Sequence, residues 1–235
     1  MIRVYVKNII HWKSPNVYEA SLEKLSPERK RQVTACVSME DRVRRLGASL
    51  VLQEALEDWT GCHEPPVRFG YVAEERKAER EMRDHGEPAR TPGMPVFRGK
   101  PYLKDYPDIH CNLSHSGEYV ACAIGEVPVG IDIQEHRGMR EKILNRYYCE
   151  DERSYVNRQM DERDRLAAFY QIWCRKEAYI KYTGLGMTQN MTSFSTLRQK
   201  DVTYEEKDFA GYSAALCYAA GDNRVEWYME KKEDG

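Results

Sequence analysis

The stretch Val129-Gly130-Ile131-Asp132-Ile133-Gln134 lies near the middle of the chain. Its three apolar side chains alternate with Gly130, Asp132 and Gln134, and this period of two predicts a strand with one face in a core. Asp132 and Gln134 then lie on the opposite face. A carboxylate and an amide oxygen at this spacing can share a hard cation such as Mg²⁺, which prefers oxygen ligands. The alternative is that Asp132 is a solvated residue on an exposed strand.

Composition and charge limit the class of protein. The chain has 235 residues, with 36 Lys and Arg against 38 Asp and Glu, so its net charge is only -2 and indicates neither a nucleic-acid-binding nor a membrane-surface protein. The seven cysteines include no CxxC pair, which predicts reduced thiols and no disulfides. No signal-peptide pattern and no transmembrane-length apolar run is present. We expect a soluble, cytoplasmic monomer that binds neither nucleic acid nor membrane.

Two long segments have the periodicity of amphipathic helices. Residues 40–59 carry apolar side chains at helical spacing and are followed by Thr60-Gly61. Residues 161–182 form the strongest predicted helix, and Thr183-Gly184 ends it. Each helix therefore finishes at the same dipeptide.

One face of the second helix carries charged side chains beside an aromatic one. Trp173, Glu177 and Lys181 are four residues apart and so lie along one face. A Glu–Lys pair at this spacing is usually exposed to solvent, but Trp173 indicates that the face is partly buried. A buried Glu–Lys face needs a polar partner. Asp132, with a metal between the acids, would supply one.

The first half contains candidate anion contacts. Residues 112–117, Asn-Leu-Ser-His-Ser-Gly, can cradle an anion or form an ordinary turn into the next strand. Lys100 projects from a Gly-Lys-Pro turn, and Arg44 lies near the start of the first long helix, as either a solvated charge or a phosphate contact. Residues 73–95 are first highly charged and then rich in Gly and Pro, which predicts an exposed insertion without chemistry.

The two halves of the chain repeat each other. Residues 53–61 align without gaps on residues 176–184 and share Glu, Ala, Thr and Gly with them. Residues 120–125 also resemble residues 216–221. The fold class that follows is α+β, with two similar halves related by a pseudo-twofold axis and the active site in the cleft between them. The first half has no acid at the position that corresponds to Asp132.

Four ordered motifs together resemble the 4′-phosphopantetheinyl transferases of the surfactin-synthetase (Sfp) type. The motifs are Gly99-Lys100-Pro101, residues 112–117, Gly130-Ile131-Asp132-Ile133 and residues 173–181. The resemblance covers residues 99–186 well and the N-terminal third loosely. It implies transfer of the phosphopantetheine arm of coenzyme A, the co-substrate, to a serine of an apo acyl, peptidyl or aryl carrier protein. Adenosine 3′,5′-bisphosphate would be released.

The resemblance also implies catalytic roles for individual residues. Asp132 and Glu177 would hold Mg²⁺, or Mn²⁺, with Gln134 as a further ligand at a position where the family often has Glu. Glu152 would accept the proton of the carrier serine. Lys181 would contact phosphate and orient Glu152.

The nucleotide end of coenzyme A is assigned to the first half by the same resemblance. Its contacts would be Arg44, Lys100, Ser114 and His115, with His115 meeting the 3′-phosphate. Residues 1–127 would then form the nucleotide-binding half, with the basic helix and the insertion near 73–95. Residues 128–235 would form the half with the metal-binding strand and the catalytic helix. The insertion has no obvious counterpart in the family.

Two other functions remain open from the sequence. Another Mg²⁺-dependent phosphate-transfer enzyme can use Asp132, Glu177 and Lys181, although the chain has no P-loop or kinase glycine-rich pattern. A non-catalytic coenzyme A or carrier-protein binding module would tolerate loss of the acids. In this chain Asp132, Glu152 and Glu177 are all present.

Overall fold

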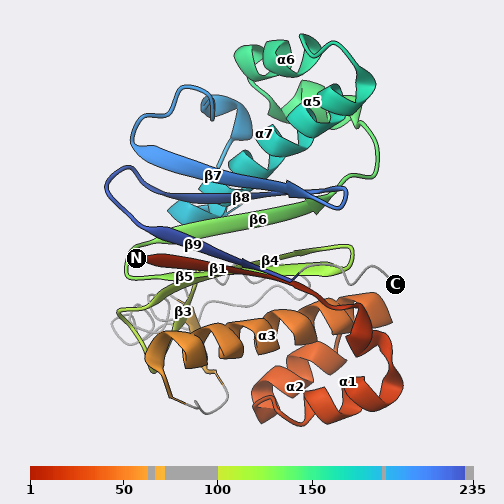
Figure 1. Cartoon of the computed structure of the whole chain (residues 1–235), viewed down its shortest axis with the longest axis vertical. Helices are drawn as coiled ribbons and strands as arrows, with labels where there is room; N and C mark the ends of the chain where they lie inside the picture. Colours follow the sequence, from red (N-terminus) through yellow and green to blue (C-terminus); the bar gives the residue numbers. More distant parts are fainter. Residues whose placement is uncertain (63–66, 72–99, 187–188, 231–235) are drawn as a thin grey trace, which may run out of the picture.

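The computed structural model describes residues 1–62, 67–71, 100–186 and 189–230. These residues form four layers, in which two β-sheets lie between two layers of helices (Figure 1). The predicted insertion at 73–95 lies outside the described residues. Among the helices that the structure describes, none is long and apolar enough to cross a bilayer.

The first sheet belongs to the N-terminal half and receives one strand from the end of the chain (Figure 1). Its strand order is β4-β5-β1-β9, formed by β1 (Ile2–Asn8), β4 (His110–Ser116), β5 (Tyr119–Gly125) and β9 (Val225–Met229). The helical layer beside it contains η1 (Ile10–Lys13), α1 (Pro15–Leu22), α2 (Pro27–Thr34) and α3 (Met39–Thr60). A separate ribbon pairs β2 (Phe69–Tyr71) with β3 (Pro101–Leu103).

The second sheet and the opposite helical layer come from the C-terminal half. The strand order is β6-β8-β7, and the strands are β6 (Val129–Glu135), β7 (Val202–Phe209) and β8 (Tyr212–Ala219). The helical elements are α5 (Glu141–Tyr147), α6 (Glu150–Asn157), α7 (Glu162–Thr183) and η3 (Met191–Ser193). Helix α7 packs on β6 and β8, while α5 and α6 pack on α7.

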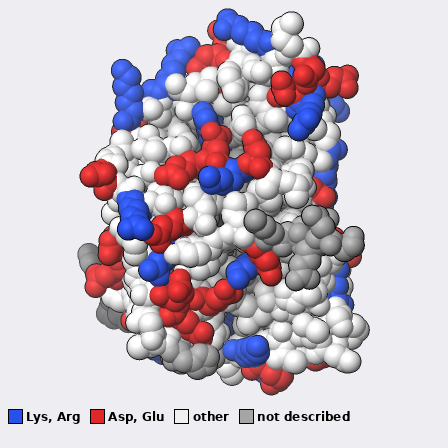
Figure 2. All heavy atoms as spheres, in the orientation of Figure 1, with Lys and Arg blue, Asp and Glu red and all other residues white. Residues whose placement is uncertain are grey.

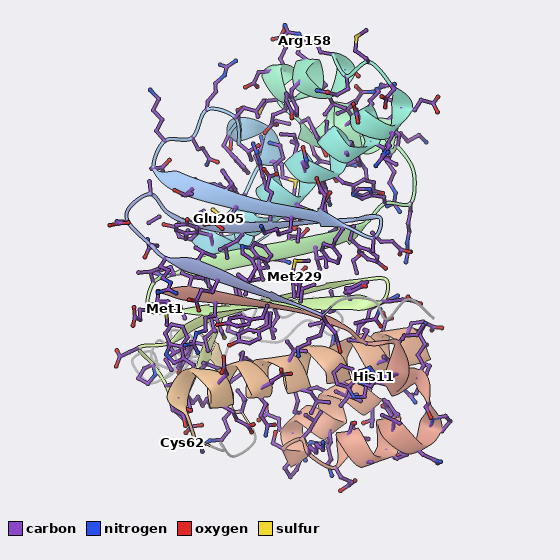
Figure 3. The ribbon with its side chains drawn as sticks, in the orientation of Figure 1. Met1, His11, Cys62, Arg158, Glu205 and Met229 are labelled. Atoms are coloured by element: carbon purple, nitrogen blue, oxygen red, sulfur yellow. The ribbon has the colours of Figure 1, made fainter. Side chains whose placement is uncertain are left out.

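The inner faces of the two sheets pack against each other. Val129, Ile131 and Ile133 of β6 are fully buried there, together with apolar side chains of β1 and β5. Met229 of β9 projects into the same region (Figure 3). The predicted period of two is therefore confirmed. Because the apolar residues of β6 face the first sheet, Asp132 faces α7.

The long helices have the predicted positions because their ends are specified locally. The Ser38 side chain accepts a hydrogen bond from Asp41 at the start of α3, and Asp161 does the same for Asp164 at the start of α7. Both helices contain 22 residues. They end at Gly61 and Gly184, whose φ angles of 71° and 70° are left-handed and favour glycine.

The connectivity of the first half is repeated in the second. In each half one strand (β1 or β6) precedes the long helix (α3 or α7) and a pair of strands (β4 and β5, or β7 and β8) follows it, and the sheet orders β4-β5-β1 and β7-β8-β6 correspond. This confirms the α+β class, while the pseudo-twofold axis itself stays a prediction. Strand β9 departs from the repeat, because it crosses to the first sheet and pairs in parallel with β1.

The strand part of the predicted repeat was aligned in the wrong register. Gly125 pairs with Ile2 at the start of β1, and Tyr218 pairs with Val129 at the start of β6. Residues 3–7 align in sequence with residues 130–134, so Ile2 corresponds to Val129 and Gly125 corresponds to Tyr218, not to Gly221 as the sequence alignment predicts. Strand β5 is buried at every position, so its sequence has no alternation that could specify a register.

Three polar side chains of β4 connect the two sheets. Asn112, Ser114 and Ser116 lie at alternate positions, so they share one face of the strand. They accept hydrogen bonds from three backbone N–H groups of β6: Ile131 (2.9 Å), Ile133 (3.3 Å) and Glu135 (3.0 Å). This side-chain ladder satisfies backbone donors of β6. Most of the motif at 112–117 is therefore strand, and only Gly117, with φ of 53°, turns the chain toward β5.

Candidate active site

The candidate site is centred on the Asp132 carboxylate, which is only 2% exposed. Its Oδ1 accepts hydrogen bonds from Lys181 Nζ at 2.6 Å and from Ser114 Oγ at 2.7 Å. Its Oδ2 accepts one from Gln134 Nε2 at 2.9 Å. These donors come from α7, β4 and β6, so the carboxylate is held by three elements. Its orientation is fixed before any ligand binds.

Gly130 allows α7 to reach this carboxylate. A Cβ atom at Gly130 would lie 2.0 Å from the carbonyl oxygen of Ala178 and 2.5 Å from the backbone nitrogen of Tyr182. No side chain can occupy that space, so glycine is required for this close helix–strand approach. The approach brings Lys181 and Glu177 to the face of β6 that carries Asp132.

Glu177 is the partly buried acid on the same side of the site. Loss of solvation raises the pKa of Glu177 to about 7, the negative charge of Asp132 adds to this rise, and Lys181 partly opposes it. The predicted Glu–Lys pair within α7 is not formed, because Lys181 Nζ bonds to Asp132. Within the described part of the chain, the Glu177 carboxylate accepts no hydrogen bond and forms no ion pair.

The donor set fits a hard cation. Asp132 and Glu177 are two carboxylates with a single ammonium group between them, and Gln134 adds an amide whose oxygen is free because its nitrogen donates to Asp132. Among the described residues, no three His, Cys, Asp or Glu side chains gather into a complete metal site. Mg²⁺ commonly uses only one or two carboxylates and takes its other ligands from phosphate and water.

A cavity of about 440 Å³ opens beside Glu177. Its walls come from both halves of the chain: Arg44, His115, Ser116 and Gly117 from the first, and Gln134, Glu135, Arg137, Arg140, Ile143, Phe169, Tyr170, Trp173 and Glu177 from the second. The lining includes aromatic rings (Phe169, Tyr170 and Trp173) and three arginines (Arg44, Arg137 and Arg140), and the part formed by these arginines and His115 is called the cationic wall. The sequence predicted a site between the halves, and the cavity has that position.

The cationic wall suits an anionic ligand. His115 lines it, and loss of solvation together with the nearby charges of Lys181 and Arg44 lowers the pKa of its imidazole. Arg44 donates from Nε to the carbonyl of Gly117 at 3.2 Å and pairs with Asp41 at 2.9 Å, which holds its guanidinium at the cavity. Multiple guanidinium groups in one cavity are well matched to phosphate oxygens.

Two of the predicted nucleotide contacts are used internally. The Ser114 hydroxyl donates to Asp132 and accepts from Lys181 Nζ at 2.9 Å and from the Ile133 backbone, so its bonding capacity is filled. Lys100 donates to the backbone carbonyls at Val129 (3.0 Å) and Tyr182 (3.4 Å). Burial lowers the pKa of its ammonium group. Ser114 supports Asp132, and Lys100 fastens the other end of β6 to α7.

Glu152 is not brought to the site. Its carboxylate is fully buried and pairs with the equally buried Lys176 at 2.8 Å. It also accepts hydrogen bonds from the backbone of Cys149 (2.8 Å) and from the backbone and hydroxyl of Thr196 (2.9 and 3.0 Å). Lys181 is not its partner. This placement argues against the expectations that Glu152 accepts the serine proton and that Lys181 orients it.

Sequence reasoning overlooked Lys176, Arg137 and Arg140. Lys176 directly precedes Glu177, and an adjacent buried cation is not visible from helical periodicity. Arg137 and Arg140 follow strand β6 by only a few residues, at the point where the chain leaves the site. Their position after a strand that carries a candidate metal ligand was the available signal.

Comparison with known proteins agrees with this chemistry. Residues 128–231, which contain Asp132 and Glu177, match the model of the 4′-phosphopantetheinyl transferase superfamily. The match covers less than half of the chain, and it shows what these residues are similar to. A similar protein is the 4′-phosphopantetheinyl transferase psf-1 of Bacillus pumilus, 40% identical over 103 residues, which are 44% of this chain and 44% of that protein.

Two further relatives extend the similarity. The 4′-phosphopantetheinyl transferase Sfp of Bacillus subtilis (strain 168) is 34% identical over 138 residues, 53% of this chain and 61% of that protein. The L-aminoadipate-semialdehyde dehydrogenase-phosphopantetheinyl transferase of Rattus norvegicus is 25% identical over 229 residues, 94% of this chain and 67% of that protein. The chain spans about half the length of the Bacillus relatives that it matches.

Proposed function

We propose that this protein transfers the 4′-phosphopantetheine arm of coenzyme A to a serine of an apo carrier protein, with release of adenosine 3′,5′-bisphosphate. The observation that carries the proposal is the Glu177 carboxylate, which forms no ion pair among the described residues, lies near Asp132 and lines a cavity that also contains arginines. The carboxylates that could bind a metal are then next to the cations that could bind phosphate. The two acids, together with Arg137 and Arg140, lie within residues 128–231, which match the model of the 4′-phosphopantetheinyl transferase superfamily.

The proposed cofactor is Mg²⁺, with Mn²⁺ as a substitute. Asp132 and Glu177 would hold it, and Gln134 would offer its amide oxygen directly or through a water. When bound, such an ion neutralises negative charge that develops on a phosphate leaving group. Lys181 would keep Asp132 in place during this step, because its ammonium group is already bonded to Oδ1.

Glu177 replaces Glu152 as the proposed proton acceptor. The serine hydroxyl must lose its proton while its oxygen attacks phosphorus, and a base with a pKa near the working pH serves this step best. In the protein without a bound metal, loss of solvation raises the pKa of Glu177 to about 7, and a cation on one of its oxygens would lower that pKa and keep the group ionised as a base. A carboxylate has two oxygens, so one can face a cation while the other accepts the proton.

The phosphates of coenzyme A would lie along the cationic wall. Arg44 and His115 keep their predicted role there, and Arg137 and Arg140 take the places that were predicted for Lys100 and Ser114. His115→Ala is expected to weaken binding of coenzyme A about tenfold, as expected for loss of one hydrogen bond to a charged group. Binding of 3′-dephospho-coenzyme A should change much less. Equal losses for the two ligands would show that His115 does not meet the 3′-phosphate.

The decisive experiment is incubation of the purified protein with coenzyme A, Mg²⁺ and a panel of apo carrier proteins, read by intact mass. We expect one phosphopantetheine group on the cognate carrier and none on its serine-to-alanine variant. Binding of coenzyme A without transfer to any carrier would favour a non-catalytic binding module. Phosphate transfer from a nucleoside triphosphate would favour another Mg²⁺-dependent enzyme. The proposal includes a monomer in the cytoplasm, which light scattering and fractionation of cells can test.

A further inference from the structure

A chain of hydrogen bonds connects four elements of the second half next to the cavity. Ser213 of β8 donates from Oγ to Asp208 Oδ1 of β7 at 2.5 Å, and Gln171 of α7 donates to Asp208 Oδ2 at 2.7 Å. His136, directly after β6, has its Nε2 atom 2.8 Å from Ser213 Oγ. A hydroxyl has one proton, and that of Ser213 goes to Asp208. His136 Nε2 must therefore be the donor, which fixes its tautomer.

The serine in this chain is not a nucleophile. In a hydrolytic triad the histidine accepts the proton of the serine, and an acid orients the histidine. Here the order is histidine, serine, acid, and Ser213 is 1% exposed. These hydrogen bonds therefore fix the position of the His136 ring.

His136 and Tyr170 together fix the loop between β6 and α5. The His136 ring stacks on Tyr170 at 4.6 Å and 15°, and its backbone N–H donates to the carbonyl of Gly211 at 2.8 Å. The Tyr170 hydroxyl accepts from the Arg137 backbone at 3.0 Å and donates to the carbonyl of Gly138 at 3.2 Å. The first residues of the loop are thus held from two sides.

This loop presents cations to the cavity. Arg137 and Arg140 both line the wall that also contains Glu177. Arg137 forms an ion pair with Glu135 at 2.6 Å, yet its side chain is 55% exposed, so its charge remains accessible to a ligand. A guanidinium group binds phosphate with a strict planar geometry. A small displacement of the loop backbone would therefore weaken that contact.

We propose that His136 is a positioning residue for phosphate binding by Arg137 and Arg140. The inference rests on the proposed function, because it takes coenzyme A as the ligand of the cavity. His136 does not touch the reacting atoms, so its loss should weaken binding of coenzyme A and leave the chemical step almost unchanged.

The test compares three variants with a matched control. His136→Phe keeps an aromatic ring on Tyr170 but has no donor for Ser213. Ser213→Ala removes the acceptor of the His136 hydrogen bond. His136→Gln places an amide donor near the position of Nε2. The control Tyr218→Phe removes a 3.0 Å hydrogen bond to Glu205 from the same strand β8, at its other end. The Kd for coenzyme A is measured by calorimetry, and KM and kcat are measured in the transfer assay.

We expect His136→Phe and Ser213→Ala to raise Kd and KM for coenzyme A about tenfold, with kcat within about twofold of the wild type, as for loss of one buried hydrogen bond that supports binding. His136→Gln should recover most of the affinity, and Tyr218→Phe should bind normally. Normal affinity in both disrupting variants, or an equal loss in Tyr218→Phe, would overturn the inference. A wild-type protein that does not bind coenzyme A would instead overturn the proposed function.

Discussion

Each long helix contacts the first strand of its half through charged side chains, and at one pair of corresponding positions, Asp58 and Lys181, the charges are opposite. In the second half, Lys181 of α7 bonds to Asp132 of β6. In the first half, Asp58 of α3 occupies the position of Lys181 and accepts a hydrogen bond from the Tyr5 hydroxyl of β1, which occupies the position of Asp132. Both halves therefore have a hydrogen bond between the long helix and the strand at these positions. In the second half the helix residue donates it, and in the first half the strand residue donates it.

A second pair of corresponding positions distinguishes the two halves. Glu54 of α3 corresponds to Glu177 of α7, and it pairs with Lys7 of β1 at 2.7 Å. The strand position of Lys7 is occupied by Gln134 in the second half. Both helices therefore carry the same glutamate, but only Glu54 has a counter-ion. We therefore propose that the candidate site depends on the absence of a cation at position 134, because this would leave the Glu177 carboxylate available for a metal.

The largest expected effect concerns the acids of the second half. Asp132→Ala or Glu177→Ala should lower transfer about 10³-fold or more, because each removes a charge worth several kcal/mol to the site. The matched variants Tyr5→Phe and Glu54→Ala should retain activity and lose about 1 kcal/mol of stability or less. Transfer rates and thermal unfolding are measured for all four. Wild-type turnover in either acid variant would rule out the metal assignment.

A cation introduced at position 134 should give Glu177 an ion pair like that between Lys7 and Glu54 in the first half. In Gln134→Lys, an ammonium group would stand where Lys7 stands and would pair with Glu177. We expect transfer to fall about 100-fold, since a paired carboxylate binds metal weakly and a cation at short range repels Mg²⁺. Initial rates at increasing Mg²⁺ measure this. Full activity of Gln134→Lys would contradict the view that an absent counter-ion creates the site.

Stability should depend on pH through Glu177 in the metal-free protein. The pKa of Glu177 is raised from 4.5 to about 7, so between these values the unfolded chain ionises while the folded protein does not. Folded stability therefore falls as pH rises through this window, by about 3 kcal/mol. Glu177→Gln removes the penalty and should raise Tm increasingly from pH 4.5 to 7.5 in the presence of a chelator.

The control for this pH effect is Glu54→Gln, which removes the ion pair with Lys7. It should lower Tm slightly and show no gain that grows with pH. A pH-independent difference between Glu177→Gln and the wild type would mean that Glu177 ionises normally in the folded protein.

The smallest expected effect is that of Gln134→Glu. A third carboxylate on the same strand face should lower the Mg²⁺ concentration for half-maximal rate by about three- to tenfold, through added attraction at short range. Mg²⁺ should also raise Tm of this variant in the absence of coenzyme A more than it raises that of the wild type. An unchanged midpoint together with an unchanged Tm response would show that this side chain does not face the metal.

Surface charge does not distinguish the two halves. Lys and Arg are interspersed with Asp and Glu over both halves of the face in Figure 2. A net charge of -2 had already indicated no strongly charged surface. The difference between the halves lies in a few partly buried side chains, which is where counter-ions have their largest effect.

Much of the fold could be predicted because its signals are local. The strand around Asp132 follows from an alternation of apolar and polar residues, and each long helix is bounded by a capping side chain and a left-handed glycine. The repeat of the two halves was visible where their helices end at Thr60-Gly61 and Thr183-Gly184. It was misaligned at β5, since a strand that is buried throughout specifies no register.

The sequence by itself determined that Asp132, Glu177 and Lys181 are the candidate site residues, because alternation along the strand and helical periodicity place them on surfaces that can face each other. Only the tertiary structure decided which groups pair. It joined Lys181 to Asp132, enclosed Glu152 with Lys176, and used Ser114 and Lys100 as internal supports. The physical reason is that counter-ions and loss of solvation are supplied by elements far away in the chain, whereas periodicity reports only the face on which a residue lies.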